Sequence, residues 1–283
     1  MSTLMHLDSI DYLLIGHLSR DLATEGDLLG GTVAYAALMA YALGMKVGMV
    51  TSWGNEFPLE PYLGSLPIVN VPTESSTTFE NFETSDGRVQ FLHNVAAPIG
   101  LHHVPESWRE APIVHLAPIA QEVDPALVRH FPASLIGITP QGWLREWDQN
   151  RRVSLSEWPE ASFVLGHTGA VVISVEDVEY NEDRIEEMVT TCRVLAVTEG
   201  AEGVRVYWNG DVRRFRPPQT KVMDTVGAGD IFATAFFYRL HSTSDPWEAA
   251  RFATQLATIS VTRRGMDSIP SSEEIKYATV EVL

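Results

Sequence analysis

The chain has 283 residues, of which 45% are hydrophobic and 20% are charged, so it can bury a sizeable core. Its 20 Lys and Arg against 37 Asp and Glu give a formal net charge of −17, which disfavours nucleic acid or an anionic membrane as a partner. One cysteine, Cys192, excludes a disulfide scaffold and a cysteine-based zinc site. The first residues lack the pattern of a signal peptide, so we expect a cytoplasmic enzyme.

Short apolar runs and one alanine-rich segment make up the N-terminal part of the chain. They predict, in order, a buried strand over 12–16, a helix over about 32–43, a buried strand over 46–51 and a weaker strand over 67–74. Gly44 and Lys46 interrupt the apolar residues between the helix and the second strand. We therefore expect no membrane-spanning helix here.

Residues 77–94 have a different pattern. Two segments of alternating polar and aromatic residues flank Asp86-Gly87, a dipeptide typical of tight β-hairpins. The alternation predicts a small sheet with one exposed face, unlike the buried strands around it.

From residue 112 onward, apolar runs alternate with helical patterns, which predicts a mostly parallel sheet covered by helices on both faces. The apolar runs lie at 112–119, 134–140, 161–167 and 193–200, and the helical patterns at 124–131 and about 181–192. A hairpin with Asn209-Gly210 at its tip is predicted over 203–218, a strand-like stretch over 221–223, and helices over about 229–242 and 246–263.

The segment DTVGAGD, residues 224–230, stands where the last of these apolar stretches meets a helix. The small residues Gly227, Ala228 and Gly229 let a ligand approach the backbone, and their amides can converge on an anion at the positive end of the helix dipole. Asp230 follows directly and is placed to accept a proton from an attacking hydroxyl. We expect the dipole to keep its carboxylate ionised. In isolation, the same residues are better explained as a glycine-rich turn with Asp230 as an ordinary N-cap.

The whole string resembles the Asp-Thr-x-Gly-Ala-Gly-Asp signature of the ribokinase-like (PfkB) carbohydrate kinase family. Its six fixed positions are met by Asp224, Thr225, Gly227, Ala228, Gly229 and Asp230. The resemblance implies an α/β, three-layer ribokinase-like fold with a mostly parallel central sheet and a small antiparallel β lid. It implies one domain over 1–283, lid strands from about 17–30 and 75–98, and transfer of a phosphoryl group from ATP to a hydroxyl, with Mg²⁺ bridging the phosphates.

The acceptor site implied by the resemblance lies in two segments. YLLIGHLSRD and LLGGTVAYAALMAYALG resemble the family's substrate-binding region, which implies that Asp21, Gly30 and Gly31 hold the acceptor. Tyr35 stands where the family often has an Asn. In ITPQGWLREWD, residues 138–148, Arg145 matches a family arginine, while Gln141 and Trp143 would shape specificity. These departures from the family pattern favour a sugar or a cyclitol such as inositol over ribose.

The donor site is implied by two further segments. AVTEGAEGVRVY, residues 196–207, resembles the family's stretch beside the ATP phosphates and ribose. Residues 257–271 resemble the stretch that borders the adenine and, in some members, a monovalent cation such as K⁺, with Gly265 as a candidate. The implied ATP-binding residues are Thr198, Gly200, Gly203, Thr225 and Gly229.

The family's Asn-x-x-Glu motif, which organises magnesium, is matched only in part, by Ser174-Val175-Glu176-Asp177. Asp177 would replace the Glu and Ser174 the Asn, with Glu176 or Glu179 as alternatives to Asp177.

Three functions remain open at this point. The first is a sugar or cyclitol kinase, and the second a nucleoside kinase, which would need an aromatic slot for the base, with Tyr35 or Trp143 as candidates. The third is a non-catalytic sugar- or nucleotide-binding protein. The intact Asp230 favours an enzyme, whereas the altered magnesium motif favours a binding protein.

Oligomeric state is open as well. The lid hairpin would either fold onto its own domain, giving a monomer, or pair with a second subunit, giving a homodimer. In the second case an apolar face would be buried, and the residues that could supply it are Phe79, Phe82, Phe91 and Leu92.

Overall fold

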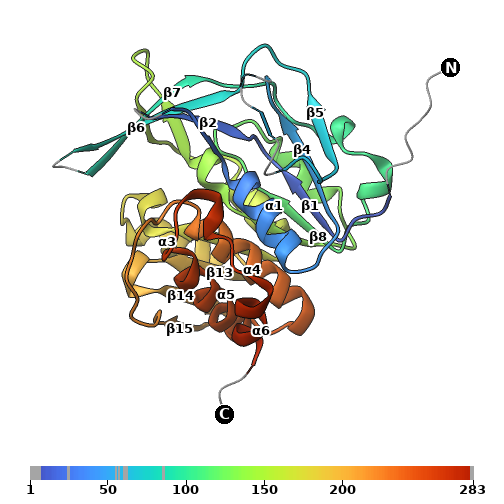
Figure 1. Ribbon diagram of the computed structural model, residues 1–283. Helices are drawn as coiled ribbons and strands as arrows, with labels where there is room; N and C mark the ends of the chain where they lie inside the picture. The colour runs from blue at the N-terminus through green and yellow to red at the C-terminus, as the bar shows by residue number, and fades with distance from the viewer. Residues whose placement is uncertain are drawn as a thin grey trace.

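The computed structural model describes residues 8–23, 26–54, 56, 58–59, 63–84 and 87–280, and over these residues a nine-stranded sheet forms the centre of the molecule (Figure 1). Seven neighbouring strands pair in parallel, and a hairpin adds two antiparallel strands at one edge. In sheet order the strands are β15 (Asp211–Phe215), β14 (Val204–Trp208), β13 (Val194–Thr198), β12 (Ala170–Ser174), β9 (Leu135–Ile138), β8 (Ile113–Leu116), β1 (Tyr12–Ile15), β4 (Val47–Ser52) and β5 (Ile68–Val71).

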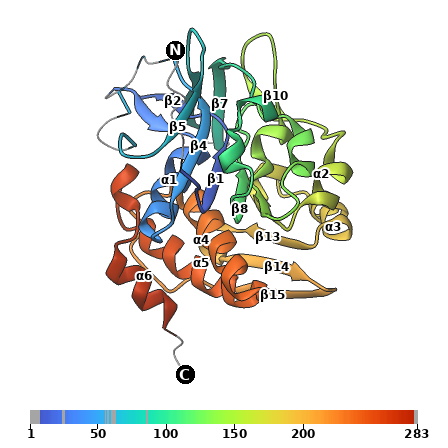
Figure 2. The same ribbon diagram turned by 90° about the vertical axis from the view of Figure 1, so that its right-hand side faces the viewer.

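Helices cover both faces of this sheet (Figure 2). One face carries α1 (Thr32–Ala42), α4 (Ala228–Thr243) and α5 (Pro246–Ser260), with α6 (Ser272–Thr279) packed on α5; the other carries the 3₁₀ helix η3 (Pro125–Arg129), α2 (Ala161–His167) and α3 (Glu182–Thr191). Each face of the sheet has its own hydrophobic core. Along β1, Tyr12 and Leu14 lie in the core under α1, α4 and α5, while Leu13 and Ile15 lie in the core under η3, α2 and α3. A strand buried on both faces needs an unbroken apolar run, which is what residues 12–15 supply.

Three expected elements differ in the structure. Residues 161–167 form helix α2 rather than a strand, and the strand that follows, β12, was not anticipated. Short apolar runs do not distinguish a strand from a buried helix by their period alone, which explains the error. The pattern at 124–131 forms only the 3₁₀ helix η3. Residues 221–223 are exposed and form no strand; the amide of Met223 donates to the carbonyl of Val261 instead.

A second sheet lies above one end of the first. Its order is β3 (Leu28–Gly30), β2 (Ser19–Leu22), β6 (Thr77–Thr84), β7 (Gly87–Asn94), so that two antiparallel pairs are joined by the parallel pair β2–β6. Asp86 of the predicted hairpin turn lies outside the described residues. These strands fall within the ranges predicted for the lid, and the predicted fold class is confirmed.

The two faces of this lid sheet have different environments. Phe79 and Leu92 are 3% exposed and pack against Ile119 and Ala120 of the same chain. On the opposite face Phe82 is 46% exposed and its ring meets that of Phe91 edge-on, with centroids 5.9 Å apart. The four apolar residues proposed for a subunit interface therefore do not share one face, because neighbouring residues of a strand point to opposite sides.

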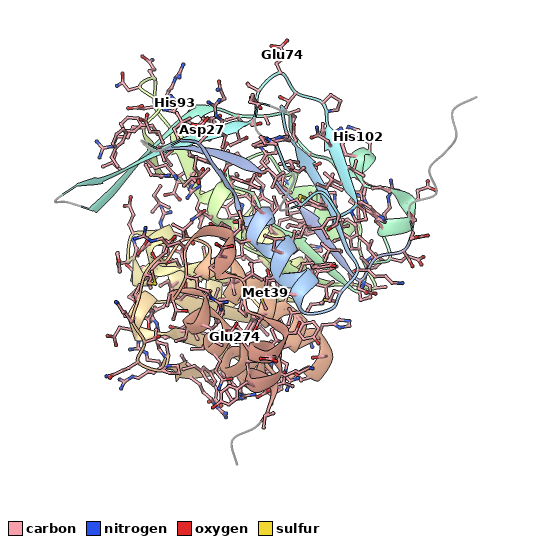
Figure 3. The ribbon with its side chains drawn as sticks, viewed as in Figure 1. Asp27, Met39, Glu74, His93, His102 and Glu274 are labelled. Atoms are coloured by element: carbon pink, nitrogen blue, oxygen red, sulfur yellow. The ribbon has the colours of Figure 1, made fainter. Side chains whose placement is uncertain are left out.

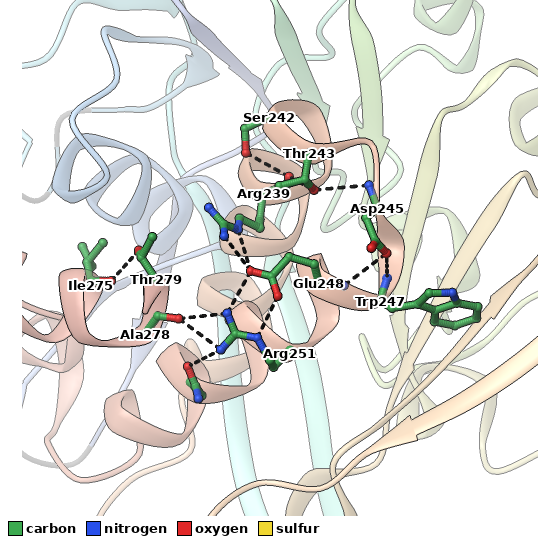
Figure 4. A network of polar contacts seen from close by, with 11 residues as sticks. Arg239, Ser242, Thr243, Asp245, Trp247, Glu248, Arg251, Ile275, Ala278 and Thr279 are labelled. Carbon is green, nitrogen blue, oxygen red and sulfur yellow. Dashed lines mark hydrogen bonds and ion pairs between the residues drawn. The ribbon is translucent and has the colours of Figure 1, made fainter. Parts of the chain in front are cut away.

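Paired charges on the lid and on the helical face stabilise the periphery. Figure 3 shows Asp27 and His93 on the lid sheet, where they pair with Arg20 and Glu80 respectively. On the helical face Glu248 of α5 accepts from Arg239 of α4 and from Arg251, which also donates to the Ala278 carbonyl of α6 (Figure 4). The bond from Arg251 is the main cause that lowers the pKa of Glu248, so this network joins three helices through one ionised carboxyl group.

Candidate active site

A cleft of about 950 Å³ lies between the lid sheet and the carboxyl ends of the central strands. Ser174 ends β12 and Thr198 ends β13, and both line the cleft. Asp21 of the lid and Asp230 of α4 line it too, so the cleft brings together segments far apart in the sequence. Ligands of open α/β sheets bind at this edge, because loops and helix N-termini converge there.

The DTVGAGD segment forms the turn that begins α4. Gly227 is the residue before the helix and has φ of +77°, and a Cβ atom on it would overlap the ring of Tyr35. Glycine is required here for two independent reasons, the left-handed backbone and the ring contact. The Ala228 amide donates to the Thr225 carbonyl at 3.2 Å, so in this structure it is occupied by a backbone bond that an anion would have to displace.

Asp224 holds this turn against the C-terminal part of the chain. One of its carboxylate oxygens accepts from the Val226 amide at 3.0 Å and the other from the Gly265 amide at 3.2 Å. Gly265 begins a 3₁₀ helix that ends at Ser268, whose hydroxyl is buried and has no hydrogen-bond partner in the part of the chain that the structure describes. An unpaired buried hydroxyl is costly, and it marks this loop as a place where a bound ion could be accommodated.

Asp230 lies in the first turn of α4 and faces the cleft. Loss of water around the carboxyl group raises its pKa to about 6, and the negative charges of Asp177 and Asp21 act in the same direction. A hydrogen bond with Thr32 and the positive charge of Arg145 oppose this rise. With a pKa of about 6 the carboxyl group is still mostly ionised at pH 7, as expected, but desolvation brings its protonation much closer to neutral pH than the helix dipole alone would suggest.

The glycine pair at 30–31 is explained by close approaches from the lid. A Cβ on Gly30 would meet the carboxylate of Asp21 and the hydroxyl of Ser19, which itself donates to Asp21 at 2.9 Å. Gly31 has φ of +89°, and a Cβ there would lie 2.6 Å from the His17 carbonyl oxygen. The two glycines thus let the Asp21 carboxylate lie against the backbone at the start of α1, directly before Thr32.

Tyr35 lies one turn further along α1 and is 4% exposed. Burial is the main cause that raises the pKa of its phenol, and Asp230, Asp224 and Asp21 add to it. Its ring packs against Gly227, as described above. Tyr35 therefore connects the acceptor-side helix α1 to the turn that begins α4.

Gln141 and Arg145 both reach the cleft, whereas Trp143 does not line it among the described residues. The Gln141 amide donates to Asp177 at 2.7 Å. Arg145 donates to the Ile119 carbonyl at 3.1 Å and lies over the ring of Phe79.

Trp143 is buried away from the cleft. It stacks on Trp158 with ring centroids 5.4 Å apart and donates to the Val123 carbonyl. The prediction that Trp143 shapes the acceptor pocket is not supported, because its ring faces are used in the core.

The altered magnesium motif forms the turn after β12. Asp177 accepts from the Ser174 amide at 2.8 Å as well as from Gln141, and the Ser174 hydroxyl accepts from the Glu176 amide. Glu176 lines the cleft, whereas Glu179 is exposed and has the left-handed φ of 52° that ends the turn.

Metal-binding capacity in the cleft is limited to scattered carboxylates. Within the described ranges no three His, Cys, Asp or Glu side chains are grouped to hold an ion. Mg²⁺ keeps several waters and commonly uses one or two carboxylates together with substrate phosphates. The charge of Asp177 acts on Asp230, but among the described residues Asp177 does not line the cleft, whereas Glu176 and Asp230 do.

The other end of the cleft contains the residues predicted for the donor. Thr198, Gly200, Gly203 and Thr225 all line it. Gly203 has φ of +97°, and a Cβ there would overlap the Phe215 carbonyl.

Sequence reasoning missed several residues at this donor end. They are Pro217, Pro218, Gln219, Thr220, Val222, Phe232 and Thr254, whereas Ala257, Thr258 and Val261 fall in the predicted stretch 257–271 and do line the cleft. The Pro217-Pro218 pair was the available signal, because two prolines cannot continue the preceding strand β15 and turn the chain out of the sheet. The apolar members of this set give the donor end a surface suited to a flat base.

The known proteins to which the chain is similar are kinases. A model of the pfkB family of carbohydrate kinases matches residues 157–273. The chain is 27% identical to a cytidine kinase of Thermococcus kodakarensis over 80% of this chain and 87% of the relative. It is also 27% identical to a fructokinase of Escherichia coli, over 60% of this chain and 61% of the relative.

Solved structures share the fold. A pyrophosphate-dependent kinase of the ribokinase family, complexed with a pyrophosphate analog and myo-inositol, superposes with a TM-score of 0.78 at 18% identity, over 94% of this chain and 99% of that protein. Ribokinase of Arabidopsis thaliana, complexed with ribose and ATP, superposes with a TM-score of 0.74 at 16% identity, over 96% of this chain and 99% of that protein.

The fold is thus ribokinase-like, and the resemblance found in the sequence is confirmed. Residues 157–273 match the pfkB carbohydrate kinases, and the relatives to which the chain is similar are themselves named kinases.

The packing of Tyr35 on Gly227 gives a test of this turn. Gly227→Ala should lower the free energy of unfolding by about 2–4 kcal/mol, because it adds a ring overlap to the strain of a positive φ. Gly210→Ala is the matched control: φ is +80° at the β14–β15 turn, but a Cβ would meet nothing within 4 Å, so only the backbone cost of about 1 kcal/mol applies. Urea unfolding measures both. Equal losses in the two variants would show that the Tyr35 contact does not constrain the turn.

Proposed function

We propose that this chain transfers the γ-phosphoryl group of ATP to a hydroxyl of an uncharged sugar or cyclitol. The observation that carries the proposal is the placement of Asp230. Its carboxyl group lies at the N-terminus of α4, in the same cleft as Asp21 and the glycine turn, with a pKa raised to about 6. A carboxylate with this pKa can take a proton near neutral pH and return it readily to solvent.

In the proposed reaction Asp21 accepts hydrogen bonds from acceptor hydroxyls, with Gly30 and Gly31 leaving room for the ring. Asp230 takes the proton of the attacking hydroxyl as its oxygen forms the new bond to phosphorus. The bond between phosphorus and the β-γ bridging oxygen breaks, and ADP leaves. The amides of Gly227, Ala228 and Gly229 stabilise the charge on the transferred group, with the positive end of the α4 dipole behind them.

The charges around the acceptor favour a neutral molecule. Asp177 and Asp21 both add negative charge around Asp230, and Arg145 is the positive charge that acts on it. Asp21, Asp230 and Arg145 line the cleft, and the charge of Asp177 acts from just behind its lining. Three carboxylates and one guanidinium repel a phosphorylated or acidic acceptor more than they attract it. The hydrogen-bonding groups of Gln90, Gln141 and Ser19 at this end suit a polyol.

A nucleoside is the second candidate acceptor, supported by the relative named a cytidine kinase. It would need an aromatic face on which a base could stack. The ring of Tyr35 packs on Gly227, Phe79 lies under Arg145, and Trp143 is used in the core. These contacts favour the sugar or cyclitol. The third possibility, a non-catalytic binding protein, is disfavoured by the charge environment of Asp230.

The groups proposed to act with this chain are ATP, Mg²⁺ and a monovalent cation. Thr198, Gly200, Gly203, Thr225 and Gly229 would contact ATP. Asp177 would hold waters of Mg²⁺, which when bound neutralises charge on the phosphates. The buried hydroxyl of Ser268 beside Gly265 and Asp224 supports a site for K⁺.

Localisation stays a prediction. No helix in the described part of the chain is long and apolar enough to span a membrane.

The proposal is tested by ADP release with ATP and Mg²⁺ over inositols, ribose, fructose, fructose phosphates and nucleosides. We expect one neutral polyol to exceed the phosphorylated sugars, and Asp230→Asn to lower its turnover at least about 100-fold. Measuring transfer with pyrophosphate in place of ATP shows whether the chain requires a nucleotide as the phosphoryl donor. Asp183→Asn, which removes an exposed carboxylate from α3, is the control and should keep full turnover.

Asp230→Asn should remain folded, which makes its loss of activity interpretable. A carboxyl group with a folded pKa raised from 3.8 to about 6 stabilises the fold below pH 4 and loses that contribution as the pH rises through 6. At pH 8 the neutral Asn therefore removes an unfavourable buried charge, and Tm should stay equal or rise. Full turnover in this variant would refute Asp230 as the base, and a phosphorylated sugar as best acceptor would refute the electrostatic argument.

The raised pKa also predicts the pH dependence of the reaction. As the pH falls through about 6, Asp230 becomes protonated, and kcat/KM should fall about tenfold for each further pH unit. Nucleotide affinity, measured by calorimetry over the same range, separates this loss from weaker donor binding. A rate that stays constant down to pH 4.5 would contradict the assignment of this pKa to the catalytic group.

A further inference from the structure

Glu122 has a buried carboxylate that the proposed reaction does not use. Its side chain is 3% exposed and lies in the turn that follows β8. One oxygen accepts from the amides of His17 and Ile119, both at 3.0 Å, and the other accepts from Ile119 at 3.0 Å and from Ala120 at 2.7 Å. All of these donors are backbone N–H groups, so the carboxylate serves as a clamp between two chain segments rather than as an ion-pair partner.

The first of the two segments is the turn at residues 118–122, which holds Arg145 in its place beside the cleft. The Ile119 carbonyl accepts from the Arg145 guanidinium at 3.1 Å. The Gly142 amide donates to the Pro118 carbonyl at 2.8 Å, and a side chain on Gly142 would overlap the backbone of residues 118–119. The position of the 118–122 turn therefore fixes the segment that contains Gln141 and Arg145.

The second segment leads to Asp21. His17 is fully buried, and its ring bonds to the Thr77 hydroxyl at 2.7 Å and the Ala97 carbonyl at 2.8 Å. Its carbonyl oxygen is the atom that requires glycine at position 31. Displacement of residue 17 would thus move both the strand that carries Asp21 and the glycine pair.

The lid also rests on the residues that Glu122 holds. Phe79 and Leu92 pack against Ile119 and Ala120, and Phe79 lies under the Arg145 guanidinium. The Glu122 carboxylate therefore connects Arg145, the segment that leads to Asp21, and the residues against which the lid packs.

From these contacts we infer that Glu122 is a positioning residue for the acceptor, acting through Arg145 and the segment that leads to Asp21. The inference rests on the proposed function of this cleft, and it concerns only its acceptor half. The donor half is built from residues after 198 that Glu122 does not contact. Its loss should therefore weaken acceptor binding and leave nucleotide binding in place.

The test is Glu122→Gln, which keeps the size of the side chain but replaces one accepting oxygen by an NH₂ group that faces backbone donors. We expect the KM of the acceptor to rise at least about tenfold, the usual effect of losing a hydrogen bond to a charged group, while the nucleotide Kd from calorimetry changes less than about twofold. Trp108→Phe is the control. It removes a partly buried hydrogen bond to the Asp8 carbonyl, and the Trp108 ring lies beside Gly48 near the start of β4, at the opposite end of the strands.

A general loss of stability and a positioning role give different results. A fold that is merely loosened should change acceptor KM and nucleotide Kd together, and Trp108→Phe at a matched loss of Tm shows the size of that effect. If the two constants change together in Glu122→Gln as well, the inference is wrong. Amide hydrogen exchange of residues 141–147 provides a readout that does not depend on turnover. It should increase in Glu122→Gln and not in Trp108→Phe.

The exchange measurement also separates failure of this inference from failure of the proposed function. If the unaltered chain shows no phosphoryl transfer to any acceptor, the proposed function fails, and exchange at 141–147 still decides whether Glu122 positions that segment. Unchanged exchange in Glu122→Gln overturns the inference whatever the activity.

Discussion

The site depends on a carboxyl group that is held partly out of water at the start of a helix. Asp230 has lost enough solvent for its pKa to rise to about 6, although a helix N-terminus and Arg145 both favour its anion. The surrounding chain is arranged around this compromise. Thr32 supplies a hydrogen bond to the carboxyl group, Tyr35 fixes the turn before it, and the cleft leaves one side open to solvent.

Glycines in this molecule mark places where two segments meet closely. At Gly30 and Gly31 a side chain would overlap residues that lead into the lid, at Gly142 it would overlap the turn after β8, and at Gly227 it would overlap the ring of Tyr35. At Gly31 and Gly142 the neighbour is backbone, while at Gly30 and Gly227 it is the side chain of Asp21 or Tyr35. A site assembled from distant parts of the chain is thereby held by close contacts that leave no room for a larger side chain.

Much of the fold follows from sequence patterns that are local. The unbroken apolar run at 12–15 and the turn signal at Asn209-Gly210 report on structure within a few residues, and both predictions are confirmed. The run at 161–167 forms a helix that packs against α3, and the prediction of a strand is wrong because a short, largely apolar run suits either element.

The candidate site was predictable to the extent that a contiguous motif carries it. DTVGAGD locates the α4 turn and Asp230, and the glycine pair locates α1. Thr32 and Glu122 act through partners far away in sequence, and no local pattern distinguishes them from ordinary polar residues. The raised pKa of Asp230 was missed for the same reason, since desolvation is a property of the assembled cleft.

The carboxylates of the acceptor end have a further consequence on the proposed reaction. In that reaction a neutral polyol enters beside Asp21 and Asp230, but it leaves as a phosphate ester with a charge close to −2. The negative charge of these carboxylates therefore has little effect on the neutral substrate but repels the anionic product. In this arrangement the charge that the acceptor gains in each turnover favours release of the product from the side of the cleft that holds the catalytic base.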